Sequence, residues 1–432
     1  MHRAASLGRQ AAIVLLTAAA PAVAMAQPGS SQPVAPVAHL SIAEAVQLAL
    51  EHNHQLRAQR LTVEMSKADE ITAALKPNPV LTSTFSNFPI FPPTQLTLDS
   101  IANNEALVAS LAYPFERGGK REKRTQVAED TTTVATRNTL DSERQLTFET
   151  QRSFIAVLLA RSALNLARED LKSFSTVADV NRERFRAGDL AEADFMKIEL
   201  QRLQFEQDVS GAELALAQAR SDLRQNVGFE RLTADFDVDG DLAFTPHTVS
   251  LDELMRDAQE SRPDLMAAQS SMKLAGDTEA LAISNGARDV TGEVEYDHSG
   301  SFNGIGFGLS FELAFHDKNQ GNKALSKVAV RQAAELEAQA RTVVLTDVTN
   351  AVNAFHNSEQ VLTLFESGYL TRARQSLEIT TYVYQGGNGT LLDLLDAERT
   401  YRTTELAYRQ ALAAYMTSVE QINLAVGKQV IP

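Results

Sequence analysis

Hydrophobic and polar residues alternate strictly in the segment 300–318. Every second residue from Ile305 to Phe315 is bulky and apolar, whereas the residues between them are glycine, serine, glutamate or alanine. A period of two with all the bulk on one side predicts a β-strand with one apolar face. Similar alternation predicts three further strands, over 80–88, 107–113 and 290–297. We therefore expect two β-hairpins, the second with a loop over 298–303.

Elsewhere the pattern predicts three α-helices in each half of the chain. The expected ranges are 41–76, 120–186 and 190–227, then 250–284, 322–385 and 390–426. A helix of about 65 residues spans about 95 Å, which indicates helices packed side by side as in a coiled coil. In the last helix, large residues from Leu394 to Ile422 recur every seven positions beside small residues from Ala397 to Ala425. These heptads favour helix packing over a ladder of tyrosine ligands.

The two halves are related in sequence. LSIAEAVQLALEHNHQL, from Leu40, resembles VSLDELMRDAQESRPDL, from Val249, and both halves end in a Val-Gly pair. The expected organisation is a signal peptide (1–26), a flexible leader (27–39), a first repeat (40–228), an inter-repeat segment (229–248), a second repeat (249–427) and a tail (428–432).

The N-terminus has the features of a secretory signal. Arg3 and Arg9 precede a short apolar run, and Ala24-Met25-Ala26 forms a cleavage site, so cleavage is expected near Ala26. Removing both arginines changes the formal net charge from −15 to −17, and this acidic balance argues against nucleic-acid binding. The chain has no cysteine, which excludes disulfides, thiolate zinc sites and an N-terminal lipid anchor on cysteine. No later segment has 18 consecutive apolar residues, so a membrane-crossing helix is not expected.

The strands themselves have the pattern of membrane strands. Each has about nine to eleven residues, the length that crosses a bilayer when tilted, and aromatic residues stand at the ends. A soluble sheet also alternates, but four strands leave the apolar face with no second sheet to cover it. Four strands cannot close a barrel, and an open edge is not tolerated in lipid. A membrane location therefore requires several copies of the chain, and three copies would supply twelve strands.

Several motifs are set aside. DFDVDGD (235–241) resembles a calcium loop but has Pro246 at the twelfth position, so a short strand is preferred. GIGFG (304–308) lies inside a strand pattern, which argues against a phosphate loop. His52 and His54 point to different helix faces, and no metal site is expected. The basic cluster of the long helix permits two interpretations, contact with lipid headgroups or a solvated face; its residues are Lys120, Arg121, Lys123 and Arg124.

The duplicated halves, the hairpins and the glycine turns together resemble the TolC-like outer-membrane efflux channel family over nearly the whole mature chain. FERGGKR (115–121) and FHDKNQGNK (315–323) are similar to the branch that exports cobalt, zinc and cadmium or copper and silver. The resemblance implies a mainly α-helical homotrimer with a periplasmic tunnel and a shared outer-membrane β-barrel, four strands per chain. It also implies a periplasmic adaptor (membrane fusion) protein and an inner-membrane, proton-driven RND pump as partners. No cofactor and no enzymatic chemistry are implied.

The resemblance also places a site at the periplasmic tip. The turn residues Gly188, Gly386, Gly387 and Gly389 would lie where the adaptor docks. Asp393 and Asp396 match carboxylates that ring the tunnel entrance, and their i, i+3 spacing puts both on one helix face; a solvated helix start is the alternative. Tyr384 and Asp194 match a pair that hydrogen-bonds between neighbouring helices and helps to hold the entrance shut. Gly389 stands where some relatives have an arginine that makes a second closing contact.

The polar strand faces complete the expected duct. Four carboxylates would line the barrel lumen and favour cations, namely Glu293, Glu295, Asp297 and Glu312. Two alternatives stay open: an exit duct for drugs or secreted proteins, and a soluble periplasmic coiled-coil adaptor or scaffold without membrane strands. A periplasmic hydrolase has no supporting motif.

Overall fold

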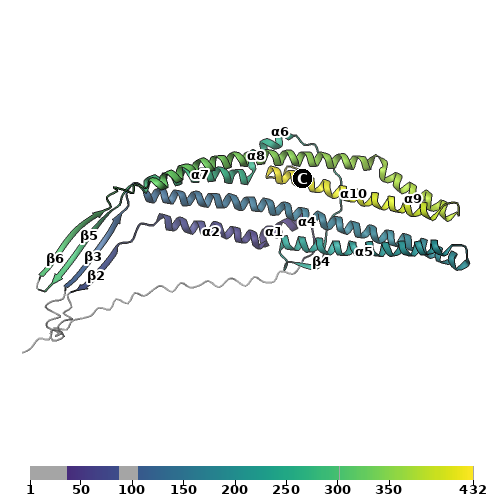
Figure 1. Cartoon of the computed structure of the whole chain (residues 1–432), viewed down its shortest axis with the longest axis horizontal. Helices are drawn as coiled ribbons and strands as arrows, with labels where there is room; N and C mark the ends of the chain where they lie inside the picture. The colour runs from purple at the N-terminus through teal and green to yellow at the C-terminus, as the bar shows by residue number, and fades with distance from the viewer. Residues whose placement is uncertain (1–36, 87–105, 301, 432) are drawn as a thin grey trace, which may run out of the picture. The chain divides into compact units, whose positions relative to one another are not determined.

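The computed structural model describes residues 37–86, 106–300 and 302–431, which belong to one compact unit. The expected signal peptide (1–26) and most of the expected leader lie outside the described residues. Within the described unit, bundled helices continue at one end into a four-stranded sheet (Figure 1). Among the described helices, none has an apolar stretch of the length and hydropathy that a membrane span requires.

The four expected strands form one antiparallel sheet in the order β2-β3-β5-β6. Their bounds are β2 Val80–Ser86, β3 Ala106–Phe115, β5 Val290–Ser299 and β6 Phe302–Phe311. The strand prediction is confirmed, with two differences. The second hairpin is tighter than expected, because β5 and β6 extend into the predicted loop. The last strand ends at Phe311, so Leu313 and Phe315 follow it rather than belong to it.

The long helix of the first repeat is continuous, whereas that of the second is divided. Helix α4 spans Lys120–Ala187, close to the predicted range. The second is divided into α8 (Gln320–Leu364), a π-helical turn (Phe365–Tyr369) and α9 (Leu370–Gln385). Gly368 in that turn has φ 112°, a conformation that glycine adopts without a steric penalty. The closing helices are α5 (Glu192–Val227) and α10 (Leu391–Val426).

The prediction of one continuous helix at the start of each repeat is wrong. The first is α1 (Ile42–His52) and α2 (His54–Ala74), and the second is α6 (Leu251–Ser261) and α7 (Pro263–Ser284). The residues between them, Asn53 and Arg262, have extended backbones. Asn53 caps α2 by accepting a hydrogen bond from the Leu56 amide, whereas Arg262 precedes a proline, where helical geometry is disfavoured.

A parallel two-stranded sheet joins the N-terminal segment to the inter-repeat segment. Strand β1 (Val37–Leu40) pairs with β4 (Leu232–Val238), which corrects the assignment of residues 37–39 to a flexible leader. The short strand preferred over a calcium loop is thereby confirmed. The Arg161 guanidinium, from α4, donates to the carbonyl oxygens of Val238 and Gly240. The guanidinium of Arg161 therefore lies against the motif DFDVDGD, which resembles a calcium loop.

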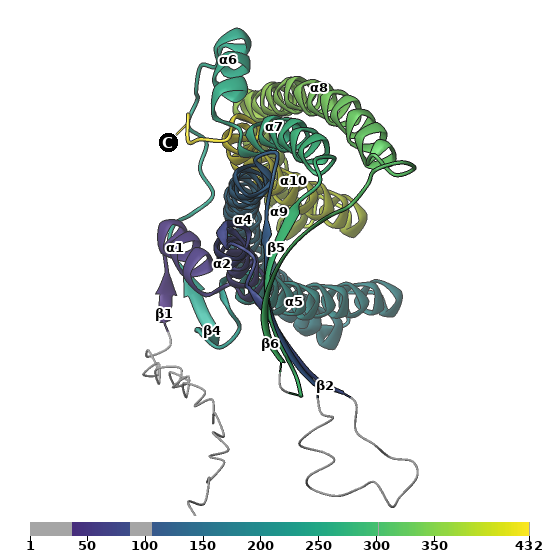
Figure 2. The same ribbon diagram turned by 90° about the vertical axis from the view of Figure 1, so that its left-hand side faces the viewer.

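Two rows of helices share α4. In the first row, α2 packs on α4, α4 on α7 and α7 on α8; in the second, α5 packs on α4, α4 on α10 and α10 on α9. Figure 2 shows these helices in the end view. The core of the second repeat includes Phe355, Tyr415 and Ile422, and that of the first includes Phe154 and Leu223. The buried heptad residues of α10 confirm that its tyrosine stripe serves packing.

Candidate functional site

Glycines shape both turns at the ends of the long helices. Gly188 ends α4 with φ 86°, and Gly387 has φ 77° in the turn between α9 and α10. Gly386 is the C-cap of α9, and its amide donates to the Tyr382 carbonyl oxygen at 3.0 Å. A Cβ atom at Gly389 would lie 3.1 Å from the Tyr384 backbone nitrogen, so this position has little room for a side chain. Both turns thus depend on glycine for conformation or for space.

Tyr384 forms a hydrogen bond between the second repeat and the first, close to these turns. Its hydroxyl donates a 2.8 Å hydrogen bond to the Asn181 side-chain oxygen of α4. Asp194 instead accepts from Lys197 at 3.0 Å, so the expected Tyr384–Asp194 bond is absent within the described chain. Burial raises the pKa of Tyr384, and the charge of Asp194 raises it further. Asp194 therefore lies near the tyrosine without bonding to it.

The two expected entrance carboxylates are exposed at the start of α10. The Asp393 amide donates to the Thr390 hydroxyl at 3.2 Å, and that hydroxyl donates to the Asp393 carboxylate at 2.6 Å. Asp396 forms an ion pair with Arg399, in which both side chains are more than half exposed. The two carboxylates thus have local partners on their own helix, and both remain accessible to solvent.

Three of the four expected lumen carboxylates lie on one face of β5. Glu293, Glu295 and Asp297 alternate along the strand, each opposite a glycine of β6. A Cβ atom at Gly306 would lie 3.8 Å from the Glu295 Cβ atom, and one at Gly308 would lie 3.6 Å from that of Glu293. Glycine on the neighbouring strand therefore leaves room beside the carboxylates. Their spacing gives one face of the sheet a row of negative charge.

Glu312 does not belong to this row. It follows the end of β6, and its carboxylate lies 3.1 Å from the Arg288 guanidinium, which precedes β5. This ion pair closes the base of the hairpin at the helical end of the sheet. Its expected place in the barrel lumen stays a prediction, and within the described chain Glu312 is paired with a cation and lies just beyond the strand.

The opposite face of the sheet is apolar and exposed. Leu111, Val294 and Phe307 stand side by side across β3, β5 and β6 in the strand register. Phe307 is 83% exposed and Leu309 is 77% exposed, which is unusual for side chains of this size. A contiguous exposed apolar face indicates contact with another apolar surface.

A buried acidic group between α4 and α10 was not predicted from the sequence. Asp170 and Glu398 are each less than 10% exposed, and Arg402 of α10 bonds to Asp208 of α5. Burial raises the pKa of Asp170 to about 6. Burial also raises the pKa of Glu398, to about 7, and the nearby charge of Asp170 contributes to this second increase. Glu398 lies seven residues after Leu391 and seven before Glu405, and all three side chains are buried along one side of α10. Carboxylates at core heptad positions were the available sequence signal.

Metal coordination has no candidate in the described part of the chain. Residues 37–86, 106–300 and 302–431 contain no cluster of three or more potential metal-ligating histidine, aspartate or glutamate side chains.

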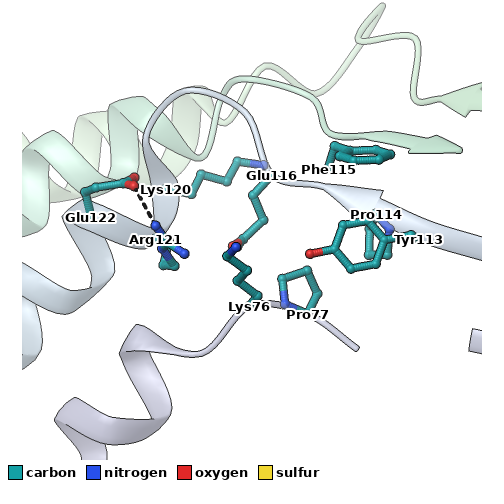
Figure 3. Close-up of a pocket in the computed structure, with 9 residues that line it drawn as sticks. All are labelled: Lys76, Pro77, Tyr113, Pro114, Phe115, Glu116, Lys120, Arg121 and Glu122. Carbon is teal, nitrogen blue, oxygen red and sulfur yellow. Dashed lines mark hydrogen bonds and ion pairs between the residues drawn. The ribbon is translucent and has the colours of Figure 1, made fainter. Parts of the chain in front are cut away.

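A pocket of about 380 Å³ lies where the sheet meets the helices (Figure 3). We call it the junction pocket; its lining residues are Lys76, Pro77, Tyr113, Pro114, Phe115, Glu116, Lys120, Arg121 and Glu122. The rings of Tyr113 and Phe115 pack edge to face with centroids 4.9 Å apart. Figure 3 shows the basic side chains Lys120 and Arg121 of α4 and Lys76 of the α2–β2 connection on one side of this aromatic pair.

Comparison with known proteins agrees with this architecture. The chain is 25% identical to the cobalt-zinc-cadmium resistance protein CzcC of Cupriavidus metallidurans over 417 residues, or 94% of this chain and 96% of that protein. It is 25% identical to the outer membrane protein TolC of Vibrio cholerae over 303 residues, covering 66% of this chain and 68% of TolC. The solved Campylobacter jejuni CmeC outer membrane channel has the same fold, with a TM-score of 0.77, 14% identity and coverage of 90% and 87%.

The family model named outer membrane efflux protein matches residues 45–228 and 254–428. These two segments include the four strands of the antiparallel sheet and most of each helix set, with both glycine turns and the carboxylate row of β5. On this match over most of the chain, the protein belongs to the outer membrane efflux protein family.

Proposed function

We propose that this chain forms the passive exit duct of a tripartite efflux system, with its sheet in the outer membrane and its helices in the periplasm. The observation that carries the proposal is the two-faced sheet. One face presents large exposed apolar side chains, and the other presents the row Glu293, Glu295 and Asp297. A barrel built from such sheets would have a lipid-facing exterior and an acidic lumen.

The edges of the unit support assembly into a ring. The two edge strands of the sheet are β2 and β6. The outermost helices of the first row are α2 and α8, and those of the second row are α5 and α9. Each terminal helix carries exposed apolar side chains, for example Met65 on α2, Leu336 on α8, Leu200 on α5 and Ile379 on α9. In every layer one edge comes from the first repeat and the other from the second. Such unlike edges form a head-to-tail contact, which closes as a cyclic oligomer.

We propose three copies, because three sheets of four strands give a barrel wide enough to leave an aqueous lumen. In this trimer the carboxylate rows of β5 would be repeated around the lumen. Their combined negative potential would repel anions and raise the local concentration of cations.

The turn end of the helices is the proposed gate and adaptor-docking end. The buried Tyr384–Asn181 bond ties α9 to α4, and nearby Asp194 adds a charge beside it. Asp393 and Asp396 stand on the first two turns of α10, exposed and close to the glycine turns. Three copies would bring six carboxylates to the entrance, where they would select cations. Gly188, Gly386, Gly387 and Gly389 would form the docking surface for a periplasmic adaptor coupled to an inner-membrane RND pump.

Heavy-metal cations are the cargo that we propose. The relative aligned over 94% of this chain is named for cobalt, zinc and cadmium resistance, and the acidic surfaces suit divalent cations. Drugs and secreted proteins are the alternative cargo. Metal resistance can be measured in a bacterial host that lacks its own exit duct, with and without this protein. Increased resistance in its presence would favour metal cations over drugs or secreted proteins as the cargo.

Ionic conductance of the full chain in a planar lipid bilayer tests the channel proposal. We expect discrete conductance steps and, under a salt gradient, a reversal potential of the sign for cation preference. The triple variant Glu293→Gln, Glu295→Gln, Asp297→Asn should lose selectivity but still insert. The control Asp252→Asn, Glu253→Gln alters exposed acids of α6 and should leave selectivity unchanged. A protein that never inserts and remains soluble without detergent would instead support the periplasmic scaffold.

A further inference from the structure

Two cationic side chains of the junction pocket, Lys76 and Arg121, take no part in the ion pairs that join the sheet to the helices. Lys120 is held by Asp289 at 2.8 Å, and Arg124 by Glu116 at 2.8 Å, so both serve the joint between sheet and helices. Within the described chain, Lys76 has no carboxylate at ion-pair distance. Among the described residues, the Arg121 side chain forms an ion pair only with the exposed Glu122, at 3.2 Å.

The net charge around the junction pocket is positive. The basic residues are Lys76, Arg117, Lys120, Arg121 and Arg124, and the acidic residues are Glu116, Glu122 and Asp289. This positive excess contrasts with the acidic chain as a whole, whose formal net charge is −15. A local positive site on an acidic protein indicates an anionic ligand.

The position of the pocket indicates what kind of anion it meets. Leu111, Tyr113 and Phe115 are two residues apart along β3, so their side chains lie on the same face of the sheet, which is the exposed apolar face. They stand at its helical end, beside Lys76 and Arg121 in the pocket. Aromatic rings next to basic side chains at the border of an apolar surface are typical of the membrane–water interface.

We propose that the junction pocket binds the phosphate group of an anionic phospholipid, with Lys76 and Arg121 as its cationic contacts. This inference rests on the proposed insertion of the sheet into a membrane. The planar guanidinium of Arg121 suits two phosphate oxygens, whereas Lys76 supplies a compact charge. The acyl chains would extend along the apolar face past Leu111, which a free phosphate ion could not do.

Native mass spectrometry of the full chain in detergent tests the assignment, with phosphatidylglycerol as the probe and phosphatidylcholine for comparison. We expect wild-type protein to retain phosphatidylglycerol preferentially. The variant Lys76→Gln, Arg121→Gln should bind it about 30-fold more weakly, since each basic side chain near a lipid headgroup contributes a fewfold factor or more. The control Lys172→Gln, Arg372→Gln removes two exposed charges on α4 and α9 and should bind as wild type does.

Equal retention of the two lipids by wild-type protein would overturn the proposal without requiring any variant to fold. Equal loss in both double variants would also overturn it, because the effect would then reflect overall charge. If soluble glycerol 3-phosphate displaces the lipid at equal concentration, the pocket recognises free phosphate and the lipid assignment fails. Conductance steps from the Lys76→Gln, Arg121→Gln variant would show that the channel proposal stands whichever lipid result is obtained.

Discussion

The Tyr384 hydroxyl and the Asn181 side-chain oxygen, 203 residues apart in the chain, form a buried 2.8 Å hydrogen bond near the turn end of the helices. Tyr384 belongs to the same core cluster as Phe174, Phe205 and Leu394, so the bond lies beside apolar side chains, and the Arg184 guanidinium lies 5.9 Å from the centre of the tyrosine ring. It is therefore a specific link between the two repeats, located next to the turns proposed to close the duct.

Replacing Tyr384 by phenylalanine should open this link. The variant leaves the buried Asn181 side-chain oxygen without its donor, whereas the Asn181 NH2 group keeps its bond to the Val177 carbonyl oxygen. We expect the variant to lose about 1–3 kcal/mol of stability and to show longer channel openings. Thermal unfolding and bilayer recordings would measure the two effects. Tyr382→Phe is the matched control, since Tyr382 is 79% exposed. Adding Asn181→Leu to Tyr384→Phe should recover stability, and no recovery would contradict this role for the pair.

The double variant Asp393→Asn, Asp396→Asn should reduce selectivity for cations over anions. The proposed entrance would lose six charges in a trimer, while the amides keep nearly the same size. The reversal potential under a salt gradient provides the measurement, with Asp252→Asn, Glu253→Gln as the control at another helix start. An unchanged reversal potential would mean that these aspartates act only as solvated first-turn residues of α10.

Arg262→Met should destabilise the second repeat by about 1–3 kcal/mol, because it removes the hydrogen bonds of the buried guanidinium to Asp264, Asp347 and the Ala425 carbonyl oxygen. The Arg262 side chain is 2% exposed and pairs with Asp347 at 2.8 Å and with Asp264. Urea unfolding of the detergent-solubilised protein would measure the loss. Arg256→Met, which removes an exposed arginine one helix earlier, should change stability by less than about 0.5 kcal/mol.

Asp170 and Glu398 should make the protein less stable as the pH rises from about 4 to about 8. Their pKa values in the folded chain, about 6 and about 7, exceed the ordinary values of 3.8 and 4.5. The folded state therefore binds more protons than the unfolded state in this window, and the free energy of unfolding falls as those protons are lost. The decrease should be at most about 3 kcal/mol for each carboxyl group.

Melting temperatures measured across this pH range provide the test. The variant Asp170→Asn, Glu398→Gln should flatten the profile and be more stable than wild type at pH 8. The exposed pair Asp252→Asn, Glu253→Gln should retain the wild-type slope. A profile that is equally steep in both variants would place the titrating groups elsewhere.

Charging the apolar stripe of α5 should separate the copies. Leu200 is 68% exposed and Leu203 is 49% exposed on the terminal helix of the second row. Leu200→Lys, Leu203→Lys would bury two cations at the proposed contact, so we expect monomers by size-exclusion chromatography with light scattering. Leu392→Lys, at a 75% exposed position of α10, is the control and should leave the oligomer intact. Trimers in all three proteins would exclude this stripe from the interface.

Repeating local patterns in the sequence determined most of the secondary structure. The period of two from Ile305 onward predicted β6, and the long helical period predicted α4 almost to its last residue. These elements follow from their own residues, because side-chain direction is set by backbone geometry. The resemblance to a family of channels was likewise carried by ordered motifs along the chain.

Contacts between distant residues decided the rest. The divisions of the helices at Asn53 and Arg262 depend partly on partners near the ends of α5 and α10, the carbonyl oxygens of Asn226 and Ala425. Tyr384 bonds to Asn181, and Arg161 fills the acidic β4 motif, because folding brings α4 beside both. No local period encodes such pairings, whose free energy depends on burial and geometry that exist only once the helices have packed.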